Sequence, residues 1–354
     1  MKKQVYIAYT GGTIGMRRTA HGYAPASGFL QQQMLVMPEL ADPVMPKFVI
    51  NEYAPLLDSS NMVAANWIEI AEDIRRHYDD YDGFVVIHGT DTMAYTASAL
   101  PFILQGLHKP IVVTGSQIPL CEVRSDGRHN LLTSLLIAAY SEIPEVCLFF
   151  GTKLLRGCRA VKVNADGLDA FESPNYPLLG QAGVEITLYR ERVLQPGGGP
   201  GPLNVKPLTG AVVGTLGIFP GISAEVVRNT LMQPLQGLVL ETYGAGNAPD
   251  KDPALTAALA EATARGVVVV NCTQCLIGGV RMGTYATGSA LARAGVISGY
   301  DMTREAALSK LFVLFSSGAT PDEVKAQMQV SLCGELTRQE PGPAEHAPVH
   351  PVNA

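Results

Sequence analysis

Short apolar runs alternate along this chain with longer stretches of mixed polarity. The runs are rich in β-branched and aromatic residues, and most end in Gly, Thr, Ser or Asn before a stretch with helical spacing begins. That alternation is typical of parallel strands buried under helices on both faces. The segments predicted as strands are residues 5–9, 84–88, 111–114, 146–150, 212–216, 237–241 and 267–271.

Two stretches show the apolar spacing of amphipathic helices most clearly. Residues 67–78 precede an acidic turn at 79–83, and residues 130–140 follow a polar loop at 124–129. Turn residues on one side and helical periodicity on the other predict where each helix begins or ends. The sequence therefore predicts an α/β protein.

A segment rich in glycine and proline divides the chain. Residues 195–202 contain four Gly and three Pro, a composition that neither a strand nor a helix tolerates. We predict a catalytic α/β domain at residues 1–190, a linker at 191–208 and a second α/β domain at 209–338. The Pro-rich end, residues 339–354, has no periodicity and is predicted to be disordered.

Composition and charge exclude several classes of protein. Of the 354 residues, 47 % are hydrophobic and 16 % charged, which excludes a disordered chain. The net charge of −6 gives no general attraction to nucleic acid or to an anionic membrane. The apolar run near the N-terminus is too short for a signal-peptide core, and no run is long enough to cross a membrane. We expect a cytoplasmic protein.

Six cysteines are scattered through the chain, most of them inside apolar runs. Cys272 and Cys275 form a C-x-x-C pair, which can be a redox pair or half of a metal site. Because no second pair and no histidine partner accompany it, we favour structural burial. The seven histidines are also scattered, so the sequence predicts neither a metal site nor a cofactor.

Two turns that directly follow predicted strands carry the candidate chemistry. Residues 10–15 read Thr-Gly-Gly-Thr-Ile-Gly and residues 88–93 read His-Gly-Thr-Asp-Thr-Met. Ligands bind at the carboxyl ends of parallel strands, so both turns are candidates for one site. A nucleotide site is disfavoured at the first, which lacks the G-x-G-x-x-G spacing and the P-loop lysine. Helix capping alone does not explain Thr90, Asp91 and Thr92 together.

These two turns resemble the two signatures of bacterial L-asparaginases. The likeness continues through residues 156–162, which resemble the family's lysine segment, and residues 244–249, which resemble a motif of its C-terminal domain. It covers residues 4–337 and is nearest to the cytoplasmic type I branch. The resemblance implies a larger N-terminal flavodoxin-like parallel-sheet domain, a smaller C-terminal Rossmann-like domain, and hydrolysis of L-asparagine to L-aspartate and ammonia.

By the same resemblance, five residues are expected to carry the catalysis. Thr13 is the nucleophile, and Thr90, Asp91 and Lys162 form a triad that activates water. Tyr23 lies in an irregular segment, residues 16–28, which looks like a mobile lid that closes over the nucleophile. Tyr23 as an ordinary loop aromatic remains an alternative. Which threonine attacks first, and whether water attacks directly, also stays open.

The resemblance assigns the substrate contacts as well. Asp58 and Ser59 would meet the α-amino and α-carboxylate ends of the substrate beside Asp91, although a solvated turn is the alternative for residues 58–60. The backbone carbonyl of Ser116 would receive the side-chain amide. Asn247 would reach the active site of a neighbouring subunit in a homodimer or homotetramer.

His88 is a tempting catalytic candidate, but a strand-end histidine before a glycine is more commonly structural. Two rival functions remain. An asparaginase-like subunit of a tRNA-dependent amidotransferase carries similar motifs after an extra N-terminal domain, whereas the glycine turn here begins at residue 10. A non-catalytic amino-acid sensor on the same fold would have lost a nucleophile or the lysine.

Type I relatives bind a second asparagine as an effector through a threonine, an arginine and a cysteine. The corresponding residues here are Val161, Glu241 and Cys275. A glutamate repels the α-carboxylate that a guanidinium would hold, so we expect no effector binding and hyperbolic kinetics. The alternative is that Arg156 or Arg159 replaces the lost charge.

Overall fold

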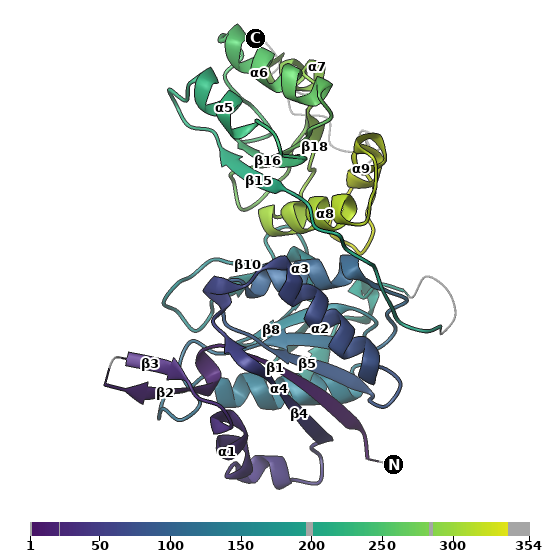
Figure 1. The fold of residues 1–354 in the computed structure, drawn as a ribbon. Coiled ribbons are helices and arrows are strands. Elements are labelled where there is room, and N and C mark those ends of the chain that lie inside the picture. Colours follow the sequence, from purple (N-terminus) through teal and green to yellow (C-terminus); the bar gives the residue numbers. More distant parts are fainter. Residues whose placement is uncertain (1, 21, 196–200, 283–285, 339–354) are drawn as a thin grey trace, which may run out of the picture.

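A computed structural model describes residues 2–20, 22–195, 201–282 and 286–338. Two α/β units follow one another along the chain, each built on its own sheet (Figure 1). The two-domain α/β prediction is therefore confirmed. The predicted disordered tail, residues 339–354, lies outside the described residues.

The N-terminal unit holds an eight-stranded sheet in the order β13-β12-β9-β8-β7-β5-β1-β4. Strands from β4 to β8 are parallel, whereas β9, β12 and β13 continue the sheet antiparallel. The sheet is thus mixed rather than purely parallel. Its strands are β1 (Gln4–Gly11), β4 (Lys47–Leu57), β5 (Gly83–Ile87), β7 (Ile111–Thr114), β8 (Val146–Phe150), β9 (Lys153–Arg156), β12 (Gly180–Ala182) and β13 (Ile186–Leu188).

Helices cover both faces of this sheet. Along β1, Tyr6 and Ala8 pack toward α2 and α3, while Ile7 and Tyr9 pack toward α1 and α4. Burial on both faces explains why the central strands are continuous apolar runs. The helices of this unit are α1 (Phe29–Leu35), α2 (Ala64–His77), α3 (Met93–Ile103) and α4 (Gly127–Tyr140).

Short elements complete this unit. They are the paired strands β2 (Met16–Thr19) and β3 (Gly22–Pro25), β10 (Val161–Lys162) and β11 (Phe171–Glu172), β6 (Leu104–Gln105) and β14 (Asn204–Val205), with single 3₁₀ turns at Thr13–Gly15, Pro38–Ala41, Ser59–Asn61, Gly157–Arg159 and Arg190–Arg192.

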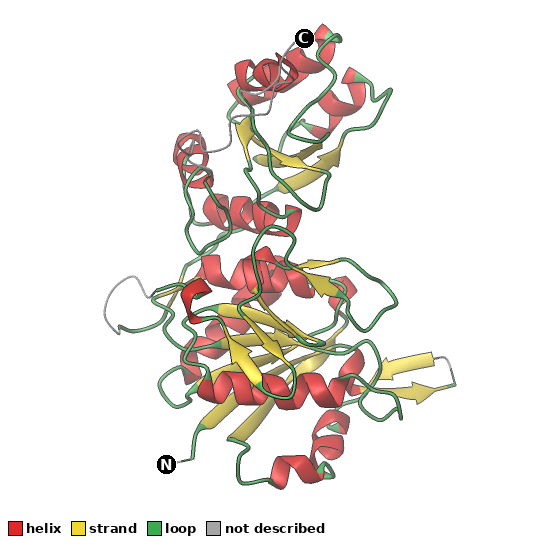
Figure 2. Cartoon of the chain, turned by 180° about the vertical axis from the view of Figure 1, so that it is seen from behind, coloured by secondary structure: helices red, strands yellow, loops and turns green. Residues whose placement is uncertain are grey.

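The C-terminal unit is a four-stranded parallel sheet between two helical layers. Helices α5 to α7 pack on one face, and α8 and α9 on the other. Figure 2 shows the unit from behind, with the helices outside the strands. Its elements are β15 (Val213–Gly217), β16 (Gly237–Thr242), β17 (Val268–Thr273), β18 (Ile297–Ser298), α5 (Ala224–Thr230), α6 (Pro253–Ala264), α7 (Ala286–Arg293), α8 (Arg304–Ser316) and α9 (Pro321–Met328).

Two connections hold the units together. Helix α8 packs directly on α3 (Figure 1). The segment after α9 returns to the N-terminal unit, where the fully buried guanidinium of Arg159 donates to the Gly334 carbonyl at 2.7 Å and lies 2.9 Å from the Asp301 carboxylate. The linker is also anchored, because β14 pairs with β6.

The sequence predicted the central strands of both sheets and the helix at 67–78, but it erred in two places. Both predicted helices, at 67–78 and 130–140, begin three residues earlier, at Ala64 and Gly127, and the Ser125 hydroxyl accepts the Gly127 N–H at 3.0 Å. The supposedly irregular residues 16–28 contain the β2–β3 hairpin. The edge strands β4, β9, β12 and β13 were also missed. Among the described residues, no helix is long and apolar enough to cross a membrane.

Candidate active site

Two glycine turns meet at the carboxyl edge of the large sheet. Strands β1 and β5 are parallel neighbours with Tyr9 opposite Ile87, so the turns that follow them lie side by side. A Cβ on Gly12, which has φ +94°, would lie 2.5 Å from the backbone nitrogen of Gly89. Only glycine permits this backbone contact. The contact brings the next residues of both turns, Thr13 and Thr90, to the same edge.

Thr13 begins a 3₁₀ turn and is half-buried. Its hydroxyl has no hydrogen-bond partner within the described part of the chain. A hydroxyl without a partner can form a hydrogen bond to a ligand, or to a residue that moves into the site when a ligand binds. Thr13 is therefore a half-buried residue of the first glycine turn whose hydroxyl is free to contact a ligand.

Thr90, Asp91 and Lys162 form a hydrogen-bonded cluster, although they are far apart in the sequence. The Lys162 amine donates to Thr90 Oγ1 at 2.9 Å and to Asp91 Oδ1 at 2.8 Å. Thr90 is buried, whereas the Asp91 side chain is 64 % exposed, so the cluster opens to solvent on the carboxylate side. Lys162 is positioned by strand β10, which pairs with β11.

Gln117 is a site residue that our motif analysis did not single out. Its amide nitrogen donates to the carbonyl oxygens of Ala165 and Gly167, each at 3.2 Å. The amide oxygen therefore faces Thr90, whose hydroxyl donates to it at 3.0 Å. The Thr90 proton thus points to Gln117 and its lone pair to Lys162. The sequence feature that could have identified Gln117 is its position directly after Ser116, in the turn that follows β7.

Ser59 lies against the second glycine turn. A Cβ on Gly89 would meet the Ser59 hydroxyl oxygen at 2.4 Å, and the Ser59 carbonyl accepts from Thr92 Oγ1 at 2.7 Å. Asp58 is exposed, and its carboxylate accepts the Ser60 N–H at 3.1 Å. Ser59 is therefore part of the same edge, while Asp58 caps the 3₁₀ turn beside it.

Ser116 and His88 complete the surroundings of the two turns. The buried Ser116 hydroxyl donates to the Ile118 carbonyl at 2.7 Å, so its side chain shapes the turn. His88 is fully buried: Nδ1 donates to the Gly89 carbonyl at 2.7 Å, and Nε2 accepts from Thr96 Oγ1 at 2.8 Å. Burial lowers the pKa of His88 to about 4, which keeps the imidazole neutral. His88 holds Gly89 in place.

Tyr23 lies on the β2–β3 hairpin, and its hydroxyl is engaged by Glu122. Its side chain is 46 % exposed, and its hydroxyl donates to Glu122 Oε1 at 2.8 Å. That hydrogen bond raises the pKa of Tyr23. The structure therefore holds this tyrosine on Glu122, and the hairpin replaces the irregular segment that the sequence suggested.

Asn247 belongs to the C-terminal unit, in a tight turn after β16. Its backbone exchanges two hydrogen bonds with Tyr243, at 2.8 and 2.9 Å. The turn is therefore well formed within one chain. Its relation to an active site of another subunit stays a prediction.

The residues expected at an effector site do line one pocket. Val161, Glu241 and Cys275 surround a cavity of about 130 Å³. The pocket holds a cation that the sequence analysis did not identify: Arg304, at 3.5 Å from Glu241 and 3.4 Å from Glu305.

The alternative that Arg156 or Arg159 restores the charge of the effector pocket is wrong, because neither lines it. Arg156 is paired with Glu145 at 2.6 Å, and Arg159 with Asp301 at 2.9 Å.

The cysteines form no disulfide in the described residues. Cys272 is buried as predicted, but Cys275 is exposed, which corrects the expectation of burial for the second half of the pair. Within the described ranges, no group of three or more His, Cys, Asp or Glu side chains could hold a metal ion.

Comparison with known proteins agrees with this geometry. A family model described as asparaginase, N-terminal, matches residues 4–194, and one described as glutaminase/asparaginase C-terminal domain matches residues 212–328. The chain belongs to the asparaginase family. It is 56 % identical over 338 residues to L-asparaginase 1 of Escherichia coli strain K12, covering 95 % of this chain and 98 % of that protein.

Other asparaginase-family relatives extend the comparison. The chain is 45 % identical over 357 residues to a 60 kDa lysophospholipase of Homo sapiens, covering 95 % of this chain and 62 % of the human protein. The crystal structure of L-asparaginase I from Vibrio cholerae matches with a TM-score of 0.89 and 53 % identity, covering 96 % of this chain and all of that one. The two family-model matches leave residues 195–211 between them, which overlaps the predicted linker.

Proposed function

We propose that this asparaginase-family chain is an amidohydrolase that converts L-asparagine to L-aspartate and ammonia. The observation that carries the proposal is the cluster at the sheet edge, where the Lys162 amine contacts both Thr90 and Asp91 beside the turn that presents Thr13. Amide hydrolysis needs a nucleophile, a proton acceptor and a group that activates water. The proposed site holds all three.

In the first step, the Thr13 hydroxyl attacks the side-chain carbonyl carbon of asparagine. A threonine hydroxyl is almost never ionised near neutrality, so a neighbour must take its proton. We assign that role to Tyr23, which would leave Glu122 when the β2–β3 hairpin closes over the substrate and would take the Thr13 proton while its own phenolic proton passes to the departing nitrogen. Ammonia departs with the proton, and an aspartyl ester on Thr13 remains. Closure also excludes bulk water.

In the second step, the triad of Thr90, Lys162 and Asp91 activates a water molecule that cleaves the ester. Thr90 would take a proton from the water while its own passes to the Lys162 amine, which Asp91 orients, and that proton returns to the Thr13 oxygen as aspartate leaves. This transfer requires the Thr90 hydroxyl to turn from Gln117 toward Lys162, because the hydroxyl now donates to the Gln117 amide oxygen. Gln117 thereby sets the resting position of the proton.

The remaining assignments concern the substrate. Asp58, Ser59 and Asp91 would bind its α-amino and α-carboxylate groups, and the backbone carbonyl of Ser116 would accept from its amide. Asn247 would come from a neighbouring subunit. We therefore propose a cytoplasmic homodimer or homotetramer that needs no cofactor.

A coupled assay of ammonia release tests the proposal. Purified protein is treated with a chelator and given L-asparagine or L-glutamine in parallel. Ammonia and aspartate released in equal amounts from asparagine, without added metal or tRNA, support the amidohydrolase. Asparagine binding without ammonia would favour the sensor. Ammonia release that depends on charged tRNA would favour the amidotransferase subunit.

A further inference from the structure

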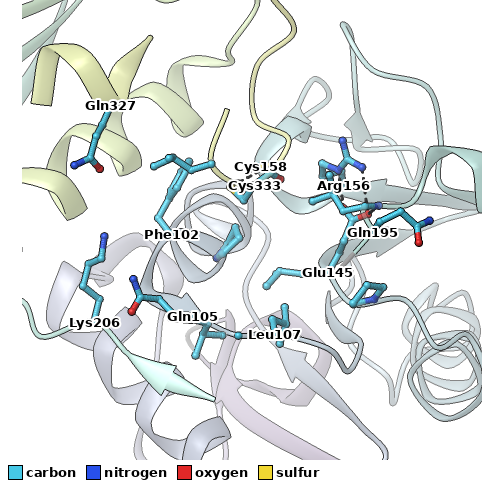
Figure 3. Close-up of a pocket in the computed structure, with 17 residues that line it drawn as sticks. Phe102, Gln105, Leu107, Glu145, Arg156, Cys158, Gln195, Lys206, Gln327 and Cys333 are labelled. Carbon is cyan, nitrogen blue, oxygen red and sulfur yellow. Dashed lines mark hydrogen bonds and ion pairs between the residues drawn. The ribbon is translucent and has the colours of Figure 1, made fainter. Parts of the chain in front are cut away.

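A second pocket lies where the two units meet, and none of the proposed active-site residues lines it. Its volume is about 430 Å³, within the range typical of small-molecule sites. The end of α3 and strand β6 supply Phe102 and Gln105, the linker supplies Lys206, and α9 with the segment after it supplies Gln327 and Leu332 (Figure 3). Both units therefore build this pocket.

The charges that line the pocket do not cancel. Glu145 and Arg156 are almost fully buried and neutralise each other, with Nε and Nη2 of the arginine at 2.6 and 3.2 Å from the carboxylate. Lys206 has no acidic or hydrogen-bonding partner for its amine among the described residues. The lining described here thus carries one uncompensated positive charge.

Lys206 is held at the pocket by its backbone rather than by a partner for its amine. Its N–H donates to the Ile103 carbonyl at 2.9 Å, next to the β6–β14 pairing. The side chain is half-buried, and burial lowers the pKa of its amine. A cation that is partly removed from water and unpaired favours the binding of an anion.

The other polar groups at this end of the pocket are amides. Gln105 and Gln327 lie on the same side as Lys206 in Figure 3, and neither side chain has a protein hydrogen-bond partner in the described ranges. An amide N–H can donate to an anion that the lysine attracts. Phe102, Leu107 and Leu332 also line the pocket and offer apolar contact, and Phe102 lies on the same side as Lys206 and Gln105 in Figure 3. The lining therefore offers an anionic head the Lys206 amine and offers an apolar body the Phe102, Leu107 and Leu332 side chains.

We propose that this interdomain pocket binds a small amphipathic organic anion, whose head contacts the Lys206 amine and whose apolar body packs against Phe102, Leu107 and Leu332. Such a ligand would contact both units at once and stabilise their arrangement. The site is separate from the proposed chemistry and does not depend on amide hydrolysis.

Isothermal calorimetry with octanoate tests the site directly. We expect saturable binding that Lys206→Met weakens about tenfold or more, because one charge-assisted contact is lost. The matched control is Lys251→Met, an exposed lysine of the other unit that should leave binding unchanged. Lys206→Arg keeps the charge and should retain most of the affinity. The variant Lys162→Met, inactive under the proposed function, should still bind octanoate.

Three results would overturn the proposal. Octylamine carries the opposite charge and should bind more weakly than octanoate. Equal affinity for the two would show that the charge of the head does not matter. Unchanged octanoate binding in a folded Lys206→Met protein, or in Lys206→Gln if the first variant does not fold, would show that the Lys206 amine does not bind the ligand. If inorganic phosphate binds and octanoate does not, the pocket is an anion site that makes no use of an apolar body. Because calorimetry reads binding alone, none of these outcomes bears on the proposed amidohydrolase.

Discussion

At the residue scale, the candidate site depends on which way single protons point. Lys162 donates to both Thr90 and Asp91, and Thr90 in turn donates to Gln117. The Gln117 orientation is fixed by two backbone carbonyls, so it cannot offer Thr90 a donor instead of an acceptor. The resting cluster is therefore a directed chain of hydrogen bonds that substrate must rearrange.

Removal of either proposed chemical group should abolish turnover while the fold survives. Thr13→Ala and Lys162→Met should each lose at least about 10³-fold in kcat, which corresponds to about 4 kcal/mol of transition-state stabilisation. Ammonia release under saturating asparagine measures the loss. Thr256→Ala, which changes a half-buried threonine of α6 in the other unit, is the matched control. Near-normal turnover in either site variant would contradict the mechanism, and mass detection of an aspartyl adduct elsewhere would reassign the nucleophile.

Gln117→Leu should lower kcat about tenfold and change the melting temperature little, because the amide orients the Thr90 hydroxyl and lies at a partly open edge. The expected signature is a fall in kcat at nearly constant KM, since Gln117 is not assigned to the substrate. Gln181→Leu, on the exposed face of β12, serves as control. An unchanged kcat would show that the Thr90 proton needs no such orientation.

His88 should make stability depend on pH. Its pKa is lowered from 6.5 to about 4 by burial, so the unfolded chain binds a proton in this interval that the folded chain does not. Stability is fully present above about pH 6.5 and is lost as the pH falls toward 4, by up to about 3 kcal/mol. Urea unfolding at pH 7.5 and 4.5 measures the difference. His88→Gln should reduce it, whereas the exposed His129→Gln should not; an equal difference in both variants would assign the effect elsewhere.

At the element scale, the β2–β3 hairpin decides whether Tyr23 can reach the nucleophile. The hairpin register places Tyr23 opposite Arg18, and its hydroxyl is bound to Glu122 before the N-terminus of α4. The hairpin packs on the 3₁₀ turn that begins at Thr13, so its base is tied to the site while its tip is exposed. Under the proposed mechanism the exposed part of the hairpin would carry Tyr23 from Glu122 toward Thr13.

Substitutions at the two ends of the Tyr23 hydrogen bond should have opposite effects. Tyr23→Phe should lower kcat by roughly 10-fold to 100-fold, because the hydroxyl that would take the Thr13 proton is gone. Glu122→Ala should leave kcat/KM unchanged or raise it about twofold, since it frees Tyr23 from the position seen here. Steady-state rates and melting temperatures of both variants provide the measurement. If Glu122→Ala lost as much activity as Tyr23→Phe, the observed pairing would itself be the active arrangement.

At the scale of the whole molecule, one buried ion pair lies within the C-terminal unit and another joins the two units. Lys310 on α8 and Glu335 in the segment after α9 are both fully buried and 2.5 Å apart, and Arg159 joins Asp301 across the junction. Removing one member of such a pair leaves an uncompensated buried charge. The junction therefore holds both the proposed anion pocket and the effector-like pocket in a fixed frame.

The effector-like pocket predicts simple saturation kinetics. Arg304 is engaged by Glu241 and Glu305, so the described lining carries two carboxylates for one guanidinium and repels an α-carboxylate. A site that does not hold asparagine cannot shift a conformational equilibrium, and we expect a Hill coefficient of one. Initial rates over a wide asparagine range check this. A coefficient clearly above one that Arg304→Ala or a change at Cys275 abolishes would show a working effector site.

The sequence by itself determined the parts that depend on local patterns. Apolar runs specified the central strands because these strands are buried on both faces, and the glycines of the two turns marked one place where two backbones meet. Thr13, Thr90, Asp91 and Lys162 were predicted as site residues from their motifs and the family resemblance, and the structure brings Thr90, Asp91 and Lys162 into contact. The edge strand β4, with alternating partial exposure, gave a weaker pattern and was missed.

Only the tertiary structure decided the features that join distant segments. Gln117 is a site residue because loop carbonyls 48 and 50 positions away orient its amide. Arg304 lies beside Glu241 because α8 runs beside β16. The guanidinium groups of Arg156 and Arg159 form ion pairs elsewhere, with Glu145 and Asp301. Lys206 became a candidate ligand-binding residue only because the fold places it in the same pocket as Gln327 of α9. Such pairings depend on how elements pack, and the free energy of packing is not encoded in any local stretch of sequence.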